Sequence, residues 1–137
     1  MATATVPDHE PGGVDRQALA DYLAGVCNRQ SELGGLDCVR FVVEALLAGF
    51  SVDLRGKLRY ADRQGALRRI RHHRGLDAAF RYELGEPLPA EELRFGDIAY
   101  VPPHAVGLVM PGYIAMKARA TIWRYKLSTA THGWRVI

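Results

Sequence analysis

The spacing of apolar residues changes character once along this 137-residue chain, and that change limits the folds it can adopt. Up to residue 84, apolar side chains recur every three or four positions, which is the period of an amphipathic helix. From residue 98 onward, short runs rich in β-branched and aromatic residues alternate with turn residues, which is typical of strands. Helices followed by a meander of strands predict an α+β fold, with N-terminal helices packed on a small antiparallel sheet.

Turn and capping residues set the expected bounds of each element. Asp15 is placed to cap the first helix, Gly49 to end the second, and residues 85–90 form a turn-rich link. The expected helices cover residues 15–29, 37–48, 62–73 and 76–84. The expected strands cover residues 98–101, 105–110, 113–118, 121–125 and 132–137.

Length and composition fit one globular domain over residues 14–137, preceded by a flexible N-terminal arm over residues 1–13. A net charge of +3 is too small to require a nucleic-acid partner. The N-terminus lacks the basic and apolar regions of a signal peptide, and no apolar run approaches the roughly 20 residues of a membrane span. We therefore expect synthesis in a cytoplasm, with no membrane span.

The segment around Cys38 carries the strongest chemical signal. Gly34-Gly35 breaks the chain, Asp37 precedes the cysteine, and an apolar helical pattern begins at once. A thiol in the first turn of a helix faces unpaired N–H groups that stabilise the thiolate. Cys38 is therefore a candidate nucleophile, although a buried, unreactive thiol at a helix start is the more common interpretation of such a residue.

The two cysteines are too few for a disulfide framework, so both are expected to be free. Cys27 ends an amphipathic helix and is expected to pack against the core. No Cys-x-x-Cys or His-x-x-x-His spacing indicates a metal site, and neither glycine pair continues into a phosphate-binding loop. We expect no metal and no cofactor.

Three segments together resemble the NlpC-type cell-wall peptidase superfamily. They are Leu36-Asp37-Cys38, the Gly-Asp strand entry at residues 94–101, and Ala-Val-Gly-Leu-Val at residues 105–109. The resemblance covers about residues 15–137 and implies a papain-like fold. It also implies catalysis by a cysteine nucleophile, a histidine base and a polar residue that orients the histidine.

Further segments resemble a small branch of that superfamily found among tail-tip and baseplate-hub genes of tailed bacteriophages. They are Leu84-Gly85-Glu86-Pro87-Leu88-Pro89, Gly96-Asp97 and Trp134-Arg135-Val136. This resemblance implies a structural protein of the virion whose partners are other phage tail or baseplate-hub proteins.

The catalytic positions of the superfamily are only partly filled here. The nucleophile falls on Cys38, but the position of the base falls on Ala105, and His104 stands one residue early. A one-residue offset in a strand turns a side chain to the opposite face. The orienting position falls near Ala115, which is also apolar. Two hypotheses follow: a structural protein with an inactive fold, or a peptidase that cleaves peptidoglycan with Cys38 as nucleophile and His104 as base.

Two further patterns have more than one interpretation. The basic segment over residues 55–81 fits a solvated face best, then a protein contact, with DNA binding the least supported. Trp123, Tyr125 and Trp134 alternate in the last strands, where core packing is the default and an interface patch is the alternative.

Overall fold

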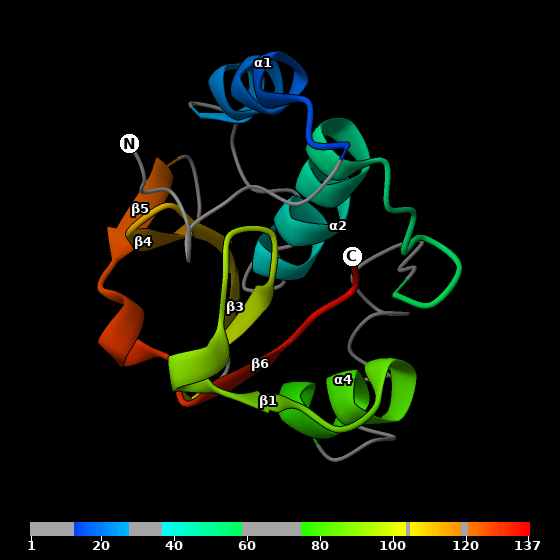
Figure 1. Ribbon diagram of the computed structural model, residues 1–137, viewed down its shortest axis with the longest axis vertical. Coiled ribbons are helices and arrows are strands. Elements are labelled where there is room, and N and C mark those ends of the chain that lie inside the picture. Colours follow the sequence, from blue (N-terminus) through cyan, green and yellow to red (C-terminus); the bar gives the residue numbers. More distant parts are fainter. Residues whose placement is uncertain (1–12, 28–36, 59–74, 104, 119–120) are drawn as a thin grey trace.

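The computed structural model describes residues 13–27, 37–58, 75–103, 105–118 and 121–137. In this part of the chain, three α-helices pack around one six-stranded antiparallel sheet (Figure 1). The fold class is therefore α+β, as the pattern change predicts. The predicted helix over residues 62–73 and the N-terminal arm up to residue 12 lie outside the described residues.

The helices occupy the predicted places with small differences at their ends. They are α1 (Arg16–Val26), α2 (Asp37–Phe50) and α4 (Leu76–Leu84). The cap at α1 is confirmed, because the Asp15 side chain accepts a hydrogen bond from the Ala18 N–H at 2.9 Å. The bounds of α4 agree with the sequence prediction at both ends.

The prediction that the second helix ends near Gly49 is confirmed, since α2 continues only one residue further, to Phe50. A Cβ built at Gly49 would lie 2.8 Å from the Cβ of Leu19 in α1. The Gly49 carbonyl also accepts a hydrogen bond from the Asp15 N–H at 2.7 Å. The glycine therefore also serves the close packing of α1 on α2.

The sheet has the strand order β1-β6-β2-β3-β4-β5. Strands β2 to β5 form the predicted meander, and the chain then returns so that β6 pairs with the other side of β2. The strands are β1 (Leu88–Pro89), β2 (Ile98–Val101), β3 (Ala105–Met110), β4 (Tyr113–Ala118), β5 (Thr121–Tyr125) and β6 (His132–Trp134). Two short 3₁₀ helices, η3 (Ala90–Glu92) and η4 (Leu127–Thr129), connect them.

Two strand predictions need correction. The turn-rich link contains the short strand β1, which pairs with β6 at Leu88↔Gly133. The last strand ends at Trp134 rather than at residue 137. It ends there because Trp134 pairs with Ile98, the first residue of β2, so the pairing with β2 stops at that point.

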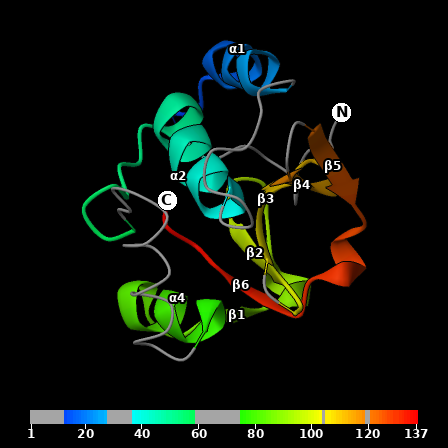
Figure 2. The ribbon, with the colours of Figure 1, turned by 180° about the vertical axis from the view of Figure 1, so that it is seen from behind.

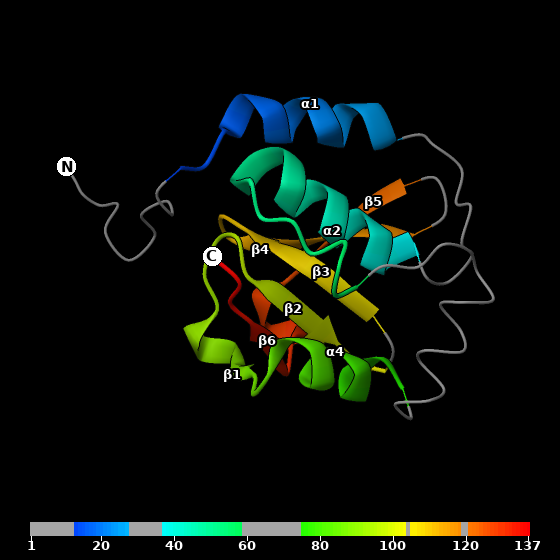
Figure 3. The same cartoon turned by 90° about the vertical axis from the view of Figure 1, so that its right-hand side faces the viewer.

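The helices lie at different parts of the sheet. Helix α2 packs over β3 and β4, and α1 packs on α2. Figure 3 shows α1 and α2 stacked on one side, whereas α4 lies beside β6 and β1 at the other end. The view from behind in Figure 2 shows the same separation. Helix α2 carries much of the core, with Val39, Val42 and Leu46 fully buried.

Candidate active site

Cys38 lies in the first turn of α2, where the sequence predicts it. The helix packs over β3 and β4, so its first turn is held against the apolar body of the protein. The Cys38 residue is 5% exposed. A reagent or substrate would therefore need a local opening to reach the sulfur.

The two other catalytic positions implied by the resemblance carry alanine in well-defined strands. Ala105 opens β3 opposite Val101, and Ala115 lies within β4 opposite Leu108. Ala115 is 1% exposed, so no solvent space remains beside its methyl group. Neither alanine can take a proton or orient an imidazole. His104, the candidate base, lies outside the described residues.

The Gly-Asp motif has a structural role that the sequence analysis missed. The Asp97 side chain is 2% exposed and faces the Arg135 guanidinium, with Arg135 Nη2 2.9 Å from Asp97 Oδ2. Arg135 Nε donates to the other carboxylate oxygen at 3.1 Å, and the Arg94 N–H donates at 2.7 Å. The hydrogen bond from Arg135 to Asp97 raises the pKa of the guanidinium. Two motifs 38 residues apart thus form one bidentate ion pair in which the carboxylate is buried and the guanidinium is partly exposed.

Close backbone packing surrounds this ion pair. Gly96 has φ +98°, and a Cβ there would lie 2.5 Å from Ile137 Cδ1. At Gly133 a Cβ would lie 2.1 Å from the Ile98 carbonyl oxygen across the sheet. Trp134, which is 1% exposed, donates from Nε1 to the Gly85 carbonyl at 3.0 Å. The three phage-like segments therefore meet along one region, which we call the β2–β6 seam: residues 84–89, 96–98 and 132–135.

A polar cluster at the start of β6 ties α4 to the sheet. His132 Nε2 lies 2.8 Å from Asp77 Oδ1, and His132 Nδ1 lies 2.9 Å from Thr131 Oγ1. The imidazole stacks on Tyr100, with ring centroids 5.0 Å apart. Burial, then the Asp77 charge, raises the pKa of Tyr100. The Tyr100 hydroxyl donates to the Pro103 carbonyl.

This cluster pairs a histidine with a carboxylate, as many acid–base catalysts do. Its contacts, however, hold both side chains in place between α4 and the sheet. Asp77 Oδ1 also accepts a hydrogen bond from Arg81 Nε at 3.1 Å. The His132 and Trp134 rings lie nearly perpendicular to each other, with centroids 5.4 Å apart. The His132 side chain is 16% exposed. The arrangement fixes α4 to β6 through the imidazole.

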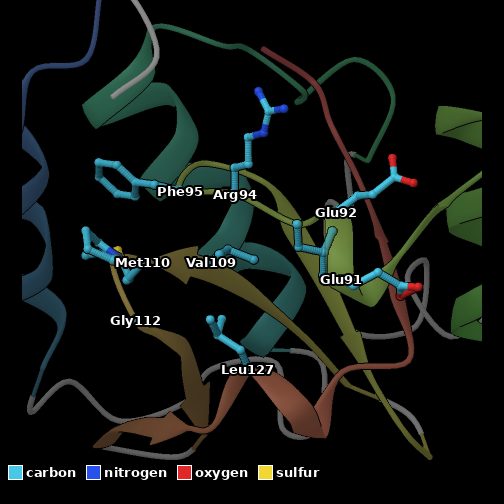
Figure 4. Close-up of a pocket in the computed structure, with 10 residues that line it drawn as sticks. Glu91, Glu92, Arg94, Phe95, Val109, Met110, Gly112 and Leu127 are labelled. Atoms are coloured by element: carbon cyan, nitrogen blue, oxygen red, sulfur yellow. The ribbon is translucent and has the colours of Figure 1, made fainter. Parts of the chain in front are cut away.

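An open pocket lies on a different part of the surface, beside the β3–β4 turn (Figure 4). Its volume is about 370 Å³, and it is bounded by η3 with the residues that follow, the β3–β4 turn and Leu127. Figure 4 shows the Glu91, Glu92 and Arg94 side chains extending from the segment before β2. Neither Cys38 nor the Asp77–His132 pair lines this pocket.

The remaining site predictions have mixed outcomes. Neither Cys27 nor Cys38 forms a disulfide, but the expectation that Cys27 packs in the core is wrong, because it is exposed at the C-cap of α1. From the basic segment, Arg55 and Arg81 form exposed ion pairs with Asp53 and Asp77. Most of that segment lies outside the described residues.

A family model described as "Domain of unknown function (DUF6950)" matches residues 14–136. The chain belongs to this family. The match spans every helix and strand of the described structure, including the first turn of α2 and the whole β2–β6 seam. No curated protein and no solved structure matches the chain significantly.

The described residues contain no candidate membrane span and no candidate metal site. No helix there is both long enough and apolar enough to cross a membrane. Within the same residues, no three histidine, cysteine or acidic side chains gather in a way that could hold a metal ion.

Proposed function

We propose that this protein is a structural component of a bacteriophage tail tip or baseplate hub, built on an NlpC-like papain fold that has lost its catalysis. The observation that carries the proposal is that the chain keeps the cysteine of the superfamily-like motifs but has alanine at the two other catalytic positions. Cys38 is 5% exposed, and the positions of the base and the orienting residue are Ala105 and Ala115.

The NlpC-like fold is supported by the order of the elements. A cysteine opens a buried helix, further helical segments follow, and an antiparallel meander carries the Gly-Asp and Val-Gly-Leu-Val segments on neighbouring strands. Gly107, within that second segment, packs so closely that a Cβ would lie 2.7 Å from the Ala115 carbonyl oxygen. The motif glycine is thus explained by strand packing.

A loss of catalysis is supported by the chemistry of the alanine positions. A thiol without a positioned base loses on the order of a hundredfold to ten-thousandfold in rate. The residues that tie the three phage-like segments together, Asp97, Arg135 and Trp134, instead make interactions that stabilise the fold. A protein selected as a building block needs these interactions and does not need the base.

The second candidate is an active cysteine peptidase or amidase that cleaves peptidoglycan during phage entry, with Cys38 as nucleophile and His104 as base. One observation favours it: Cys38 lies in the first turn of a 14-residue helix, where the helix dipole stabilises a thiolate. In that mechanism the histidine would take the thiol proton before attack on the peptide carbonyl.

Two assays on the full chain test the proposal. We expect the tagged protein, co-produced with tail-tip and baseplate-hub proteins of a tailed bacteriophage, to co-purify with at least one of them. We also expect the purified protein and its Cys38→Ser variant to release equal, background amounts of dye from labelled peptidoglycan. Dye release that depends on Cys38 would establish the peptidase instead, and failure to bind any tail protein would overturn the structural role.

A further inference from the structure

Strand β5 is an edge strand whose sequence lacks the usual protection. It pairs with β4 on one side, and no described strand pairs with its other side. Its sequence, Thr-Ile-Trp-Arg-Tyr, contains neither proline nor lysine, the residues that most often block edge pairing. Trp123 at its centre is 51% exposed. Figures 1 and 3 show β5 at the outer end of the sheet.

The backbone hydrogen bonds of the sheet fix which groups of β5 face outward. Val109 accepts from the Gly96 N–H and donates to the Asp97 carbonyl, both at 2.9 Å, so its backbone groups point away from β4. The N–H and C=O groups of successive residues in a strand point to opposite sides. The backbone groups of Leu108 therefore point toward β4 and bond to its partner there, Ala115. Ala115 therefore does not bond to its β5 partner Arg124.

It follows that the N–H and C=O groups of Arg124 point away from β4, toward the outer side of the edge. Ile122 lies two residues earlier on the same strand and points the same way. Trp123, between them, directs its backbone groups to β4. The outer edge of β5 thus presents two pairs of donors and acceptors, symmetrically placed about Trp123.

We propose that the occupant of this edge is the β5 strand of a second copy of the chain, paired antiparallel about a two-fold axis at Trp123. In this register, Ile122 of each copy lies opposite Arg124 of the other, and each such pair exchanges two backbone hydrogen bonds. All four outward groups on each strand are then paired. The two Trp123 residues lie directly opposite each other, where cross-strand side chains approach most closely.

The charge on the strand suits this register. Arg124 is the only charged residue of β5, and it faces Ile122 of the other copy rather than another charge. Its guanidinium lies 4.5 Å from the ring centroid of Tyr113 in its own chain. A register centred on Arg124 would instead set two guanidinium groups directly opposite each other, which is destabilising. The argument for the dimer uses only the geometry of this edge, so it is independent of whether the protein belongs to a phage tail.

Light scattering after size-exclusion chromatography measures the predicted assembly. We expect a mass of twice the 15.2 kDa of one chain, and the mass of one chain for Trp123→Arg, which sets like charges opposite each other. The matched control is Tyr82→Arg, the same kind of change at a residue of α4 that is 73% exposed, and it is expected to keep the dimer. Circular dichroism verifies that each variant is folded.

Disulfide trapping tests the register in a Cys27→Ser background. Directly opposite Cα atoms in a non-hydrogen-bonded pair lie about 4.5 Å apart, so Trp123→Cys should form a covalent dimer under mild oxidation. In Thr121→Cys the two thiols would sit about 14 Å apart along the strands and should not link. A monomer at the highest soluble concentration, a dimer that persists in Trp123→Arg, or equal trapping at both positions would overturn the proposal.

Discussion

The first turn of α2 and the β2–β6 seam differ sharply in how they use their polar residues. The two strand positions to which the superfamily resemblance assigns polar partners of Cys38 hold Ala105 in β3 and Ala115 in β4. Along the seam, Asp97 and Arg135 join elements that are far apart in sequence, and Trp134 does the same by its bond to Gly85. The polar residues of the seam stabilise the fold, whereas two positions that the superfamily resemblance assigns to catalysis hold apolar residues.

This difference shows that a motif can be shared for its structural role alone. In the sequence, Asp97 belongs to the Gly-Asp step that contributes to the resemblance to the NlpC-type superfamily. In the structure its carboxylate accepts three hydrogen bonds from Arg135 and Arg94. If this difference is real, substitutions in the seam should lower the free energy of unfolding, and the thiol at the N-terminus of α2 should be unreactive.

The largest effect is expected for Asp97→Ala. The change leaves the Arg135 guanidinium and the Arg94 N–H without their carboxylate, and we expect a loss of about 3 kcal/mol in the free energy of unfolding. Urea unfolding followed by circular dichroism measures it. Asp53→Ala, which removes the exposed partner of Arg55, is the control and should cost far less. Equal losses in the two variants would mean that the seam ion pair does not stabilise the fold.

A smaller loss is expected for Trp134→Phe. Phenylalanine keeps an aromatic ring beside Phe80, whose centroid lies 5.2 Å from that of Trp134, but it removes the donor to the Gly85 carbonyl. We expect a loss of about 1–2 kcal/mol in the same urea assay. An unchanged midpoint and slope would show that the indole N–H does not anchor the α4–β1 link.

The buried Tyr100 phenol should make the protein less stable at alkaline pH. Burial raises its pKa above the ordinary tyrosine value of 10.0, so the folded protein favours the neutral phenol. This contribution is complete below pH 10 and is lost as the pH rises through the higher pKa of the folded state. Wild-type stability should therefore fall more steeply above pH 10 than that of Tyr100→Phe. Parallel pH profiles of the two proteins would contradict the burial of the phenol in the cluster.

The smallest effect lies outside both regions, at the exposed Asp53–Arg55 pair. Hydrogen bonds from Arg55 lower the pKa of Asp53 from 3.8 to about 2. Any stabilisation it provides is present above pH 3.8 and is lost as the pH falls toward 2. A carboxyl NMR titration should give a midpoint near 2, and Arg55→Ala should return it toward 3.8. A midpoint near 3.8 in the wild type would show that the ion pair does not persist in solution.

Local signals predict most of the fold. Gly75 and Gly85 bracket α4, and Pro102-Pro103 and Pro111-Gly112 bracket β3, so the bounds of these elements follow from the sequence. The end of β6 does not follow, because the pattern over residues 132–137 continues as a strand. The strand ends where Trp134 meets Ile98, the first residue of β2, and no local pattern connects these two residues.

The candidate site is less predictable from the sequence. Cys38 at a helix start follows from the glycine pair and the apolar pattern, but its burial depends on how α2 packs on β3 and β4. The Asp77–His132 contact joins residues 55 positions apart and has no sequence signal. Alternation assigns Trp123 and Trp134 alike to the core, yet β5 is the edge strand and β6 is internal, so only Trp134 is buried.

The rate of Cys38 alkylation by iodoacetamide, measured from pH 5 to 9 in a Cys27→Ser background, tests the central claim most directly. We predict slow labelling across this range, the same rate in a His104→Ala variant, and fast labelling only after unfolding in urea. Fast labelling well below pH 8 that slows in His104→Ala would contradict the account, because it would reveal an activated thiol with a working base.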